Sequence, residues 1–321
     1  MFVARVRSKV TKVSWVVAGG FAAWAAARIL AADRLRRTDT PVAPLMSFTP
    51  QVASAAPWAV LGLRLAGQRR PAATAALAAT ALGLAVRPRG NPRTQPLARG
   101  SVLRVITANL YVGRADAETI VGLVRQFDAD VLFVQELTED AVTRLKQAGL
   151  EDLLPHAQPE LRGGSQGSGL YSRFPLGDGP EVPPVTSAQP TALIELPSGE
   201  EVELVCVHPA PPALAQGDVT ARWKAELAVL PAPGERPRVV AGDFNATLDH
   251  APFRDLLRLG YVDAARQTGN ALTPTWGIPG KSPLFALDHV LVSSACAVLA
   301  SSVHAVPGTD HRAVYAEIQL P

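Results

Sequence analysis

The chain has 321 residues, enough for one large domain and an accessory segment, and its charge is unevenly distributed. The first hundred residues carry 15 of the 31 Lys and Arg residues but two of the 28 acidic residues, a net charge of +13, which leaves −10 for the remainder. An acidic remainder lacks the clustered basic residues with which proteins bind duplex DNA, which argues against a nucleic-acid scaffold and weakly favours a metal site. Cys206 and Cys296 lie in apolar runs, so we expect buried thiols rather than a disulfide framework.

Three apolar stretches occupy the first third of the chain, at Val13–Ala32, Phe48–Ala66 and Pro71–Val86. A helix needs about 20 apolar residues to cross a bilayer, and the first stretch approaches that length. Arg28 lies close enough to its end for the side chain to reach the interface. Because basic loops separate the stretches, we predict a membrane-spanning region over residues 1–86 with three segments, in a multi-pass protein of the cell membrane.

Two other interpretations of this region were weighed. A cleaved signal peptide fits the basic start of the first stretch, but the apolar run is long and further arginines follow it. A soluble Ala-rich helical hairpin is the alternative for all three stretches. Basic residues divide six against seven between the two sides of the membrane, which does not decide the orientation. An odd number of spans from a basic cytoplasmic N-terminus places the following domain outside the cytoplasm.

Residues 87–100 are rich in Pro, Gly and Arg and are predicted to form a solvated linker. From residue 101 to 321 the pattern is that of a regular α/β domain. Strands are expected at 101–110, 130–135, 169–172, 192–195, 201–207, 238–242, 287–292 and 313–320, and helices at 116–127, 138–147, 222–229 and 252–258. Strands and helices alternate early and strands cluster later, which predicts a four-layer α/β sandwich of two packed mixed sheets flanked by helices.

Polar residues lie at or just beyond the ends of the apolar runs in this domain. They are Asn109, Glu136, His208, Asp243, Asn245, Asp288 and the pair Asp310–His311. Strand ends at one edge of a packed core form the floor of a cleft, because the core fixes their positions while solvent reaches them. Carboxylate and amide oxygens suit Mg²⁺, with Mn²⁺ as an alternative, and the sequence has no His/Cys cluster with zinc spacing.

The run RVVAGDFNA at 238–246 is the most specific signal. Gly242 permits a tight bend, after which an extended backbone would place Asp243 and Asn245 on one side and Phe244 on the other, in the core. A carboxylate there accepts a proton from water, and a neutral amide beside it donates to a phosphate oxygen. This pairing suits hydrolysis of a phosphoester, which needs a group to orient water and positive charge to neutralise phosphate.

The same run resembles the GDFN signature of the endonuclease/exonuclease/phosphatase superfamily, and the resemblance extends in order over residues 101–321. The strings that carry it are TANL (107–110), DADVLFVQEL (128–137), GSGLYSRFPL (167–176), VCVHPAPP (205–212), GDFNA (242–246), LDHVLVS (287–293) and TDHRAV (309–314). The resemblance implies a magnesium-dependent phosphoester hydrolase. Two departures from the DNA-repair branch, an absent acidic residue two positions after Asn109 and His208 in place of a tyrosine, argue against a lesion-specific nuclease.

The resemblance also implies a role for each polar residue. Glu136 would be the principal metal ligand, with Asn109 and Asp310 completing the set. Asp243 would orient or deprotonate the attacking water, Asn245 would hold the phosphate, and His208 would contact the phosphate or leaving group. His311 would face the scissile phosphate, with Asp288 accepting a hydrogen bond from its other ring nitrogen and favouring its charged form.

These observations together predict a membrane-anchored hydrolase of phosphoesters. The substrate class stays open among nucleic acid, a phospholipid headgroup and a small phosphoester, with the lipid bilayer as a further partner and no protein partner inferred. The alternative is a non-catalytic membrane-anchored binding module that retains the fold. The mode of cleavage, the number of metal ions and the oligomeric state are not determined by the sequence.

Overall fold

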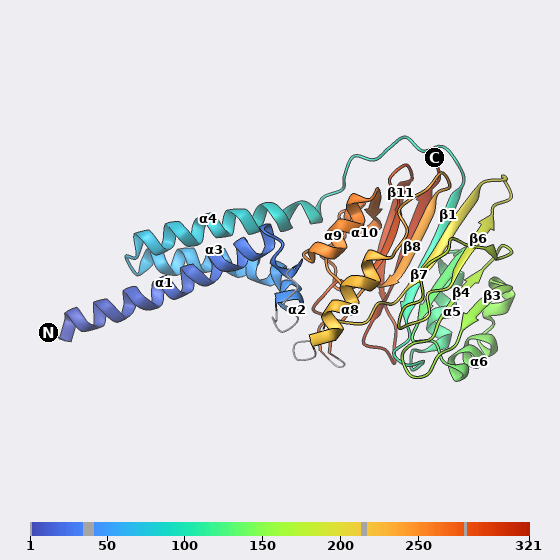
Figure 1. Ribbon diagram of the computed structural model, residues 1–321, viewed down its shortest axis with the longest axis horizontal. Coiled ribbons are helices and arrows are strands. Elements are labelled where there is room, and N and C mark those ends of the chain that lie inside the picture. The colour runs from blue at the N-terminus through green and yellow to red at the C-terminus, as the bar shows by residue number, and fades with distance from the viewer. Residues whose placement is uncertain (1, 35–41, 213–216, 279–280) are drawn as a thin grey trace.

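The protein consists of a helical stalk and a β-sandwich, as a computed structural model shows (Figure 1). The structure describes residues 2–34, 42–212, 217–278 and 281–321. The N-terminus lies at the far end of the stalk, and the C-terminus lies on the sandwich. The stalk and the sandwich meet at the C-terminal ends of the first and third long helices and at the start of the second.

Three long helices form the stalk, and they overlap the three apolar stretches. The helical elements are α1 (Phe2–Ile29), the 3-10 helix η1 (Ala32–Arg34), α2 (Val42–Met46), α3 (Thr49–Leu65), α4 (Arg69–Val86) and the 3-10 helix η2 (Arg87–Gly90). Within the described residues, only Ser8–Ile29 of α1 is long and apolar enough by length and composition to cross a membrane. Both α3, with 17 residues, and α4, with 18, are shorter.

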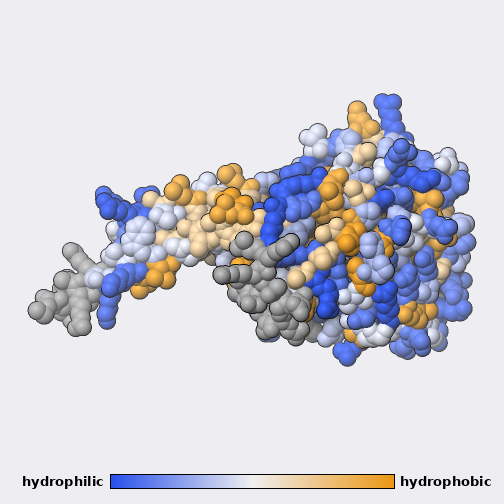
Figure 2. All heavy atoms as spheres, in the orientation of Figure 1, coloured by the Kyte–Doolittle hydropathy of each residue, from blue (hydrophilic) through white to orange (hydrophobic). Residues whose placement is uncertain are grey.

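The stalk packs small residues inside and leaves large apolar residues outside. Ala18, Ala72 and Ala75 are buried between the helices, whereas Trp58 and Leu77 are about three-quarters exposed, at 74% and 75%. Figure 2 shows the stalk as mostly orange and pale, with blue side chains gathered toward its two ends. This arrangement reverses that of a soluble helical bundle, whose outward faces are polar.

Two six-stranded mixed sheets make up the sandwich, as predicted. The first sheet has the order β11 (Ala297–Ala305), β12 (Arg312–Gln319), β1 (Val102–Asn109), β2 (Val131–Gln135), β4 (Ser168–Ser172) and β3 (His156–Glu160). The second has the order β5 (Gly177–Asp178), β6 (Thr191–Glu195), β7 (Glu201–Val207), β8 (Arg238–Asp243), β10 (Asp288–Ser293) and β9 (Tyr261–Asp263). The central pairs β1–β2 and β7–β8 are parallel, and their neighbours are antiparallel.

The main core lies between the sheets, where Phe133, Leu204 and Ala241 are fully buried. The helices α5 (Ala117–Gln126), α6 (Glu139–Gln147) and α7 (Leu150–Leu153) cover the first sheet, α8 (Gly217–Ala228) and α9 (Ala251–Arg258) cover the second, and the short α10 (Ala264–Gln267) lies beside β10 and β11. Both cysteines are buried free thiols, as expected.

The register of the central strands brings their polar ends together. In the first sheet, Asn109 at the end of β1 pairs with Gln135, the residue before Glu136. In the second sheet, Val207 pairs with Gly242, and Asp243 pairs with Asp288 at the start of β10. Because strands in parallel register end at the same edge of the sheet, the chain places its polar residues along one edge of the sandwich.

Residues 87–100 connect the stalk to the sandwich and are mostly exposed, but two of their side chains are held by the sandwich. Arg89 is buried and binds Asp249 in the sandwich at 2.5 and 2.7 Å. Gln95 exchanges two hydrogen bonds with the backbone of Val298, at 2.5 and 2.7 Å. A Pro- and Arg-rich composition does not reveal such partners, because they lie far away in the sequence.

Candidate active site

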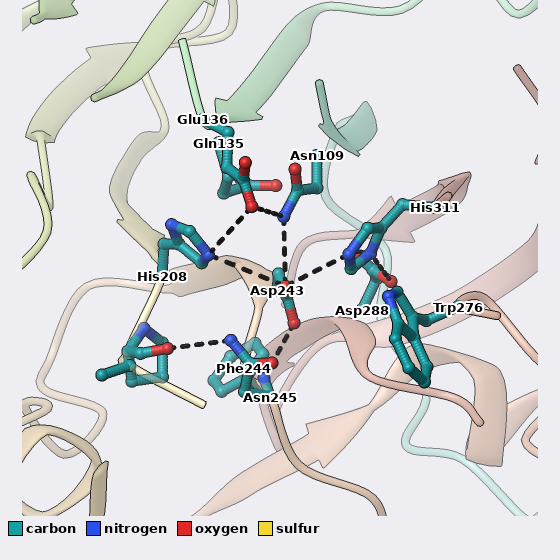
Figure 3. A network of polar contacts seen from close by, with 12 residues as sticks. Asn109, Gln135, Glu136, His208, Asp243, Phe244, Asn245, Trp276, Asp288 and His311 are labelled. Carbon is teal, nitrogen blue, oxygen red and sulfur yellow. Dashed lines mark hydrogen bonds and ion pairs between the residues drawn. The ribbon is translucent and has the colours of Figure 1, made fainter. Parts of the chain in front are cut away.

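Side chains at or next to the ends of six strands, β1, β2, β7, β8, β10 and β12, converge at the edge of the sandwich (Figure 3). Asn109 lies at the centre of the group, and its Nδ2 donates to Glu136 Oε1 at 3.2 Å and to Asp243 Oδ2 at 3.1 Å. One amide therefore joins the first sheet, which carries Glu136, to the second, which carries Asp243. The Oδ1 atom of Asn109 accepts from the backbone N–H of Tyr111 at 2.9 Å, so in this arrangement the amide holds the two carboxylates by its nitrogen.

Glu136 is held by a strained stretch of backbone. Its own φ is +55°, and the facing residues Tyr111 and Val112 have φ values of +49° and +52°. Such values are unfavourable for non-glycine residues and especially for a β-branched one. They allow the N–H of Val112 to donate to Glu136 Oε2 at 2.8 Å. Burial raises the pKa of Glu136, although the hydrogen bonds from Asn109 and Val112 oppose that rise.

The GDFN loop positions Asp243 in the same space. Gly242 has a φ of +152°, and a Cβ there would collide with the carbonyl oxygen of Val207, so glycine alone fits. The next side chain, Phe244, is fully buried in the core and packs edge-on against Phe253, as the alternation predicted. Burial raises the pKa of Asp243 despite the neighbouring imidazole of His311.

Asn245 lines the pocket beside Asp243. It adopts a φ of +48°, and its backbone N–H donates to Asp243 Oδ1 at 2.8 Å. Its Nδ2 donates to the carbonyl of Pro209 at 2.9 Å, which leaves its second amide hydrogen for another acceptor.

His311 and Asp288 form the acid–imidazole pair that the sequence predicted. Nδ1 of His311 lies 2.9 Å from Asp288 Oδ2, and Nε2 lies 3.6 Å from Asp243 Oδ2. Thr275 fixes the carboxylate, because its hydroxyl donates to Asp288 Oδ2 at 2.6 Å. Burial alone lowers the pKa of His311, but Asp288 and Asp243 outweigh it and raise the pKa to about 10, so the imidazole is protonated at neutral pH.

His208 lies on the other side of Asp243 from His311, and its pKa is shifted in the opposite direction. Its Nε2 lies 3.8 Å from both Glu136 Oε1 and Asp243 Oδ2. Burial lowers its pKa, with Asp243 opposing, so the ring is favoured in the neutral form. The site therefore holds one charged and one neutral imidazole around the same carboxylates.

Asp310 completes the site, and it lies next to Trp276, a residue that the sequence did not mark as part of the site. Its Oδ2 accepts from the indole Nε1 of Trp276 at 3.0 Å. Its Oδ1 is buried and has no hydrogen-bond partner among the described residues, and it lies 3.9 Å from Nε2 of His311. Trp276 and Thr275 sit in a loop without periodic or motif signals strong enough to mark them as site residues.

The carboxylates of this cluster fit a divalent cation. Glu136, Asp243, Asp288 and Asp310 contribute four acidic groups, against one imidazole favoured in the charged form. Asp243, Asp288 and His311 place ligand atoms within 4.8 Å of one another. Both oxygens of Asp288 are already bonded to His311, and one also to Thr275, so the oxygens with unfilled capacity belong to Glu136, Asp243 and Asp310. Such hard oxygen donors suit Mg²⁺ or Mn²⁺.

One pocket of about 530 Å³ unites the predicted residues. Six of them line it: Glu136, His208, Asp243, Asn245, Asp310 and His311. The other two, Asn109 and Asp288, are buried and form hydrogen bonds with Asp243 and His311, which line the pocket. A larger hollow of about 760 Å³ lies beside β5 and contains none of them. The convergence that the sequence analysis required is therefore present.

The two-sheet sandwich thus carries a group of carboxylates, an Asp–His pair and the GDFN loop together at one edge. The chain belongs to the endonuclease/exonuclease/phosphatase family, whose model matches residues 106–311. Membership classes it as a hydrolase that acts on phosphoester bonds. A search of curated proteins finds no match.

Solved structures agree on the fold. A member of the same family from Beutenbergia cavernae has 20% identity and a TM-score of 0.55, with 68% of this chain and 72% of that chain covered. TDP2 from D. rerio, crystallised with a single-strand DNA product, has 18% identity and a TM-score of 0.53, covering 68% and 99%. A family member from Bacteroides vulgatus has 17% identity and a TM-score of 0.52, covering 69% and 100%.

Proposed function

We propose that the protein is a magnesium-dependent hydrolase that cleaves a phosphoester by direct attack of water. The observation that carries this proposal is the meeting of Glu136, Asp243 and His311 in a single pocket, although 175 positions separate the first from the last in the chain. Glu136 and Asp310 would hold the cation, with Asn109 fixing the first of them. When bound, the cation supplies positive charge to the phosphate oxygens.

The remaining residues transfer the proton of the attacking water or contact the phosphate group. Asp243 orients the attacking water and accepts its proton, since its Oδ2 faces the pocket between the two imidazoles. His311, charged and fixed by Asp288, donates from Nε2 to the phosphate. Asn245 offers its second amide hydrogen to a phosphate oxygen, and neutral His208 contacts the phosphate or the leaving group.

Removal of divalent cations is expected to lower kcat by at least about 100-fold, because a cation at such a site supplies several kcal/mol of transition-state stabilisation. The full chain, purified in detergent, would be assayed with bis-p-nitrophenyl phosphate before and after chelation. Readdition of Mg²⁺ or Mn²⁺ should restore turnover, whereas Ca²⁺ serves as the comparison ion. Undiminished activity in the presence of chelator would reject this mechanism.

We further propose that the stalk anchors the enzyme in a membrane by three spans. The uncharged runs 13–27, 49–63 and 71–86 lie side by side in α1, α3 and α4. The first and third runs have a charged residue directly at each end, and the second ends at Arg64. Each run rises over roughly 22–24 Å as a helix, which is shorter than the apolar thickness of about 30 Å, so the long basic side chains next to the runs would extend to the interface. Buried alanines and exposed Trp58 and Leu77 fit helices that pack through small residues against a lipid exterior.

The anchor and its orientation are tested together. The full chain is expected to stay in the membrane fraction after an alkaline carbonate wash, because apolar helices are not released with peripheral proteins. An alkaline phosphatase fused after Pro321 should be active, which places the sandwich outside the cytoplasm. A fused green fluorescent protein at the same position should be dark when exported by the same route. Release by carbonate would contradict the anchor, and the reverse reporter pattern would contradict the orientation.

A further inference from the structure

The N-terminal region contributes a wall to the active-site pocket. Pro44, Ser47 and Phe48, from α2 and the turn into α3, line the pocket together with the catalytic residues. Phe48 meets the ring of Phe285 edge-on, with centroids 4.8 Å apart, and Phe285 stacks on Trp276 at 5.8 Å. We call Pro44, Phe48, Trp276, Phe285 and Leu287 the apolar wall.

The apolar wall is fixed by contacts between the stalk and the sandwich. Gln51, in the first turn of α3, donates from Nε2 to the carbonyl of Leu284 at 2.9 Å. Trp276 and Phe285 form a bridge to each other, and Trp276 also bonds Asp310. An aromatic surface therefore leads without a break from the start of α3 to a carboxylate of the catalytic cluster.

The position of the wall places it at the boundary of the proposed membrane. Phe48 immediately precedes α3, which begins at Thr49 at the end of the stalk nearest the sandwich, and it is 40% exposed. Ile29 and Leu30, at the same end of α1, are also exposed. Aromatic residues favour this boundary, where an apolar ring faces lipid and a polar surrounding faces water. The pocket mouth thus lies beside the bilayer surface.

The described lining of the pocket has no cationic Lys or Arg side chain of the kind with which proteins commonly bind a polyanion. Residues 101–321 carry a net charge of −10. Proteins bind a nucleic-acid strand through several phosphates, each of which needs a basic or donor group. A molecule with one phosphate and an apolar tail makes no such demand, since the catalytic cluster takes the phosphate and the apolar wall takes the tail.

We propose that the apolar wall is a binding subsite for the hydrocarbon part of a membrane lipid, so that the enzyme cleaves a lipid phosphoester at the bilayer surface. This inference rests on the proposed hydrolase activity and deepens it by naming the substrate class. Water attacks phosphorus, the phosphorus–oxygen bond to the leaving alcohol breaks, and the leaving oxygen takes up a proton from solvent, which balances the proton that the attacking water loses. Asp243 takes the proton of the attacking water.

The test uses three phosphodiesters that share the p-nitrophenol leaving group and differ in the second ester: methyl, hexyl and 5′-thymidyl. The full chain in nanodiscs is expected to give a kcat/KM for the hexyl ester on the order of 10-fold above that for the methyl ester, because part of five added methylenes becomes buried. The thymidyl ester should not exceed the methyl ester. A hexyl chain stays monomeric in solution, so the preference reports the pocket rather than aggregation.

Phe48→Ala is expected to reduce the hexyl-to-methyl ratio toward one, while the matched variant Trp58→Ala, an exposed aromatic of the same helix, keeps it. The ratio is the readout because loss of folded protein lowers both values alike. An unchanged ratio in Phe48→Ala, equal rates for all three esters, or a preference for the thymidyl ester would overturn the subsite while leaving the hydrolase in place. Failure to turn over any ester in the presence of Mg²⁺ would instead reject the proposed function.

Discussion

Replacing Asp243 with asparagine is expected to lower kcat for bis-p-nitrophenyl phosphate by at least about 100-fold, the usual contribution of a positioned general base. The substitution keeps the size and the acceptor for the N–H of Asn245. It removes the basic oxygen Oδ2, which lies 3.6 Å from His311 Nε2 and accepts the hydrogen bond from Asn109. Steady-state kcat of the full chain with saturating Mg²⁺ is the measurement. Glu118→Gln, which neutralises an exposed carboxylate on α5, is the matched control and should retain full activity.

The same variant is expected to be as stable as the wild type or more stable when both are unfolded in chelator. Burial raises the pKa of Asp243, so above its ordinary value of 3.8 the ionised carboxylate disfavours the folded state. A neutral side chain removes that cost, as is common at functional sites. Thermal unfolding followed by circular dichroism decides the point. A large fall in the unfolding temperature would show that the lost activity reflects damage to the fold rather than to the chemistry.

The sandwich was predictable because its central strands are continuous apolar runs that end in polar residues. β1, β2, β8 and β10 lie within a residue or two of the expected bounds. The strands missed are edge or short strands, β3, β5, β9 and β11, which bury only part of each face. In β11 the nine residues Ala297–Ala305 mix buried and exposed positions without strict alternation, so sequence periodicity does not mark the strand.

The candidate site was predictable where its residues follow strands, and it was not where they come from loops. The pairing of His311 with Asp288 and the burial of Phe244 were both anticipated. Trp276 and Thr275 were not identified as parts of the site, because their contacts with Asp310 and Asp288 depend on a loop whose path no local pattern determines. The contribution of Phe48 to the pocket was not predictable either, because an apolar stretch indicates a helix but does not show which distant residues the helix contacts.

The contact between the stalk and the sandwich lies in the same loop as the catalytic aspartate. Asp249, six residues after Asp243, is completely buried and binds Arg28 at 2.6 Å and Arg89 at 2.5 Å. Asp33 accepts from the backbone N–H of Ala251 at 2.6 Å. Arg28 therefore meets a carboxylate of the sandwich, where the sequence suggested that it would reach the membrane interface. The stalk and the loop that follows Asp243 are consequently parts of one packed unit.

Asp249→Ala is expected to destabilise the protein by about 3–5 kcal/mol, because it leaves the buried guanidinium of Arg89 without its partner. For a chain of this size that loss corresponds to a fall of roughly 10 °C in the unfolding temperature. Although burial tends to raise the pKa of Asp249, hydrogen bonds and charge from Arg89 and Arg28 outweigh it and lower the pKa below 3.8. The stabilisation is thus complete above pH 4 and is lost as the pH falls through the lowered pKa, so the variant should differ from the wild type throughout pH 5–8.

A second stalk-to-sandwich ion pair provides the comparison. Arg34 binds Asp255 on α9, but both side chains are about half exposed, at 46% and 47%. Asp255→Ala is therefore expected to change the free energy of unfolding by less than about 1 kcal/mol. Removing Arg89 together with Asp249 should recover part of the loss, because the more deeply buried guanidinium is then gone and only that of Arg28, which is 14% exposed, is left without the carboxylate. If Asp249→Ala and Asp255→Ala were equally mild, the buried pair would not join the two parts, and the stalk would be a tether rather than a structural element of the catalytic loop.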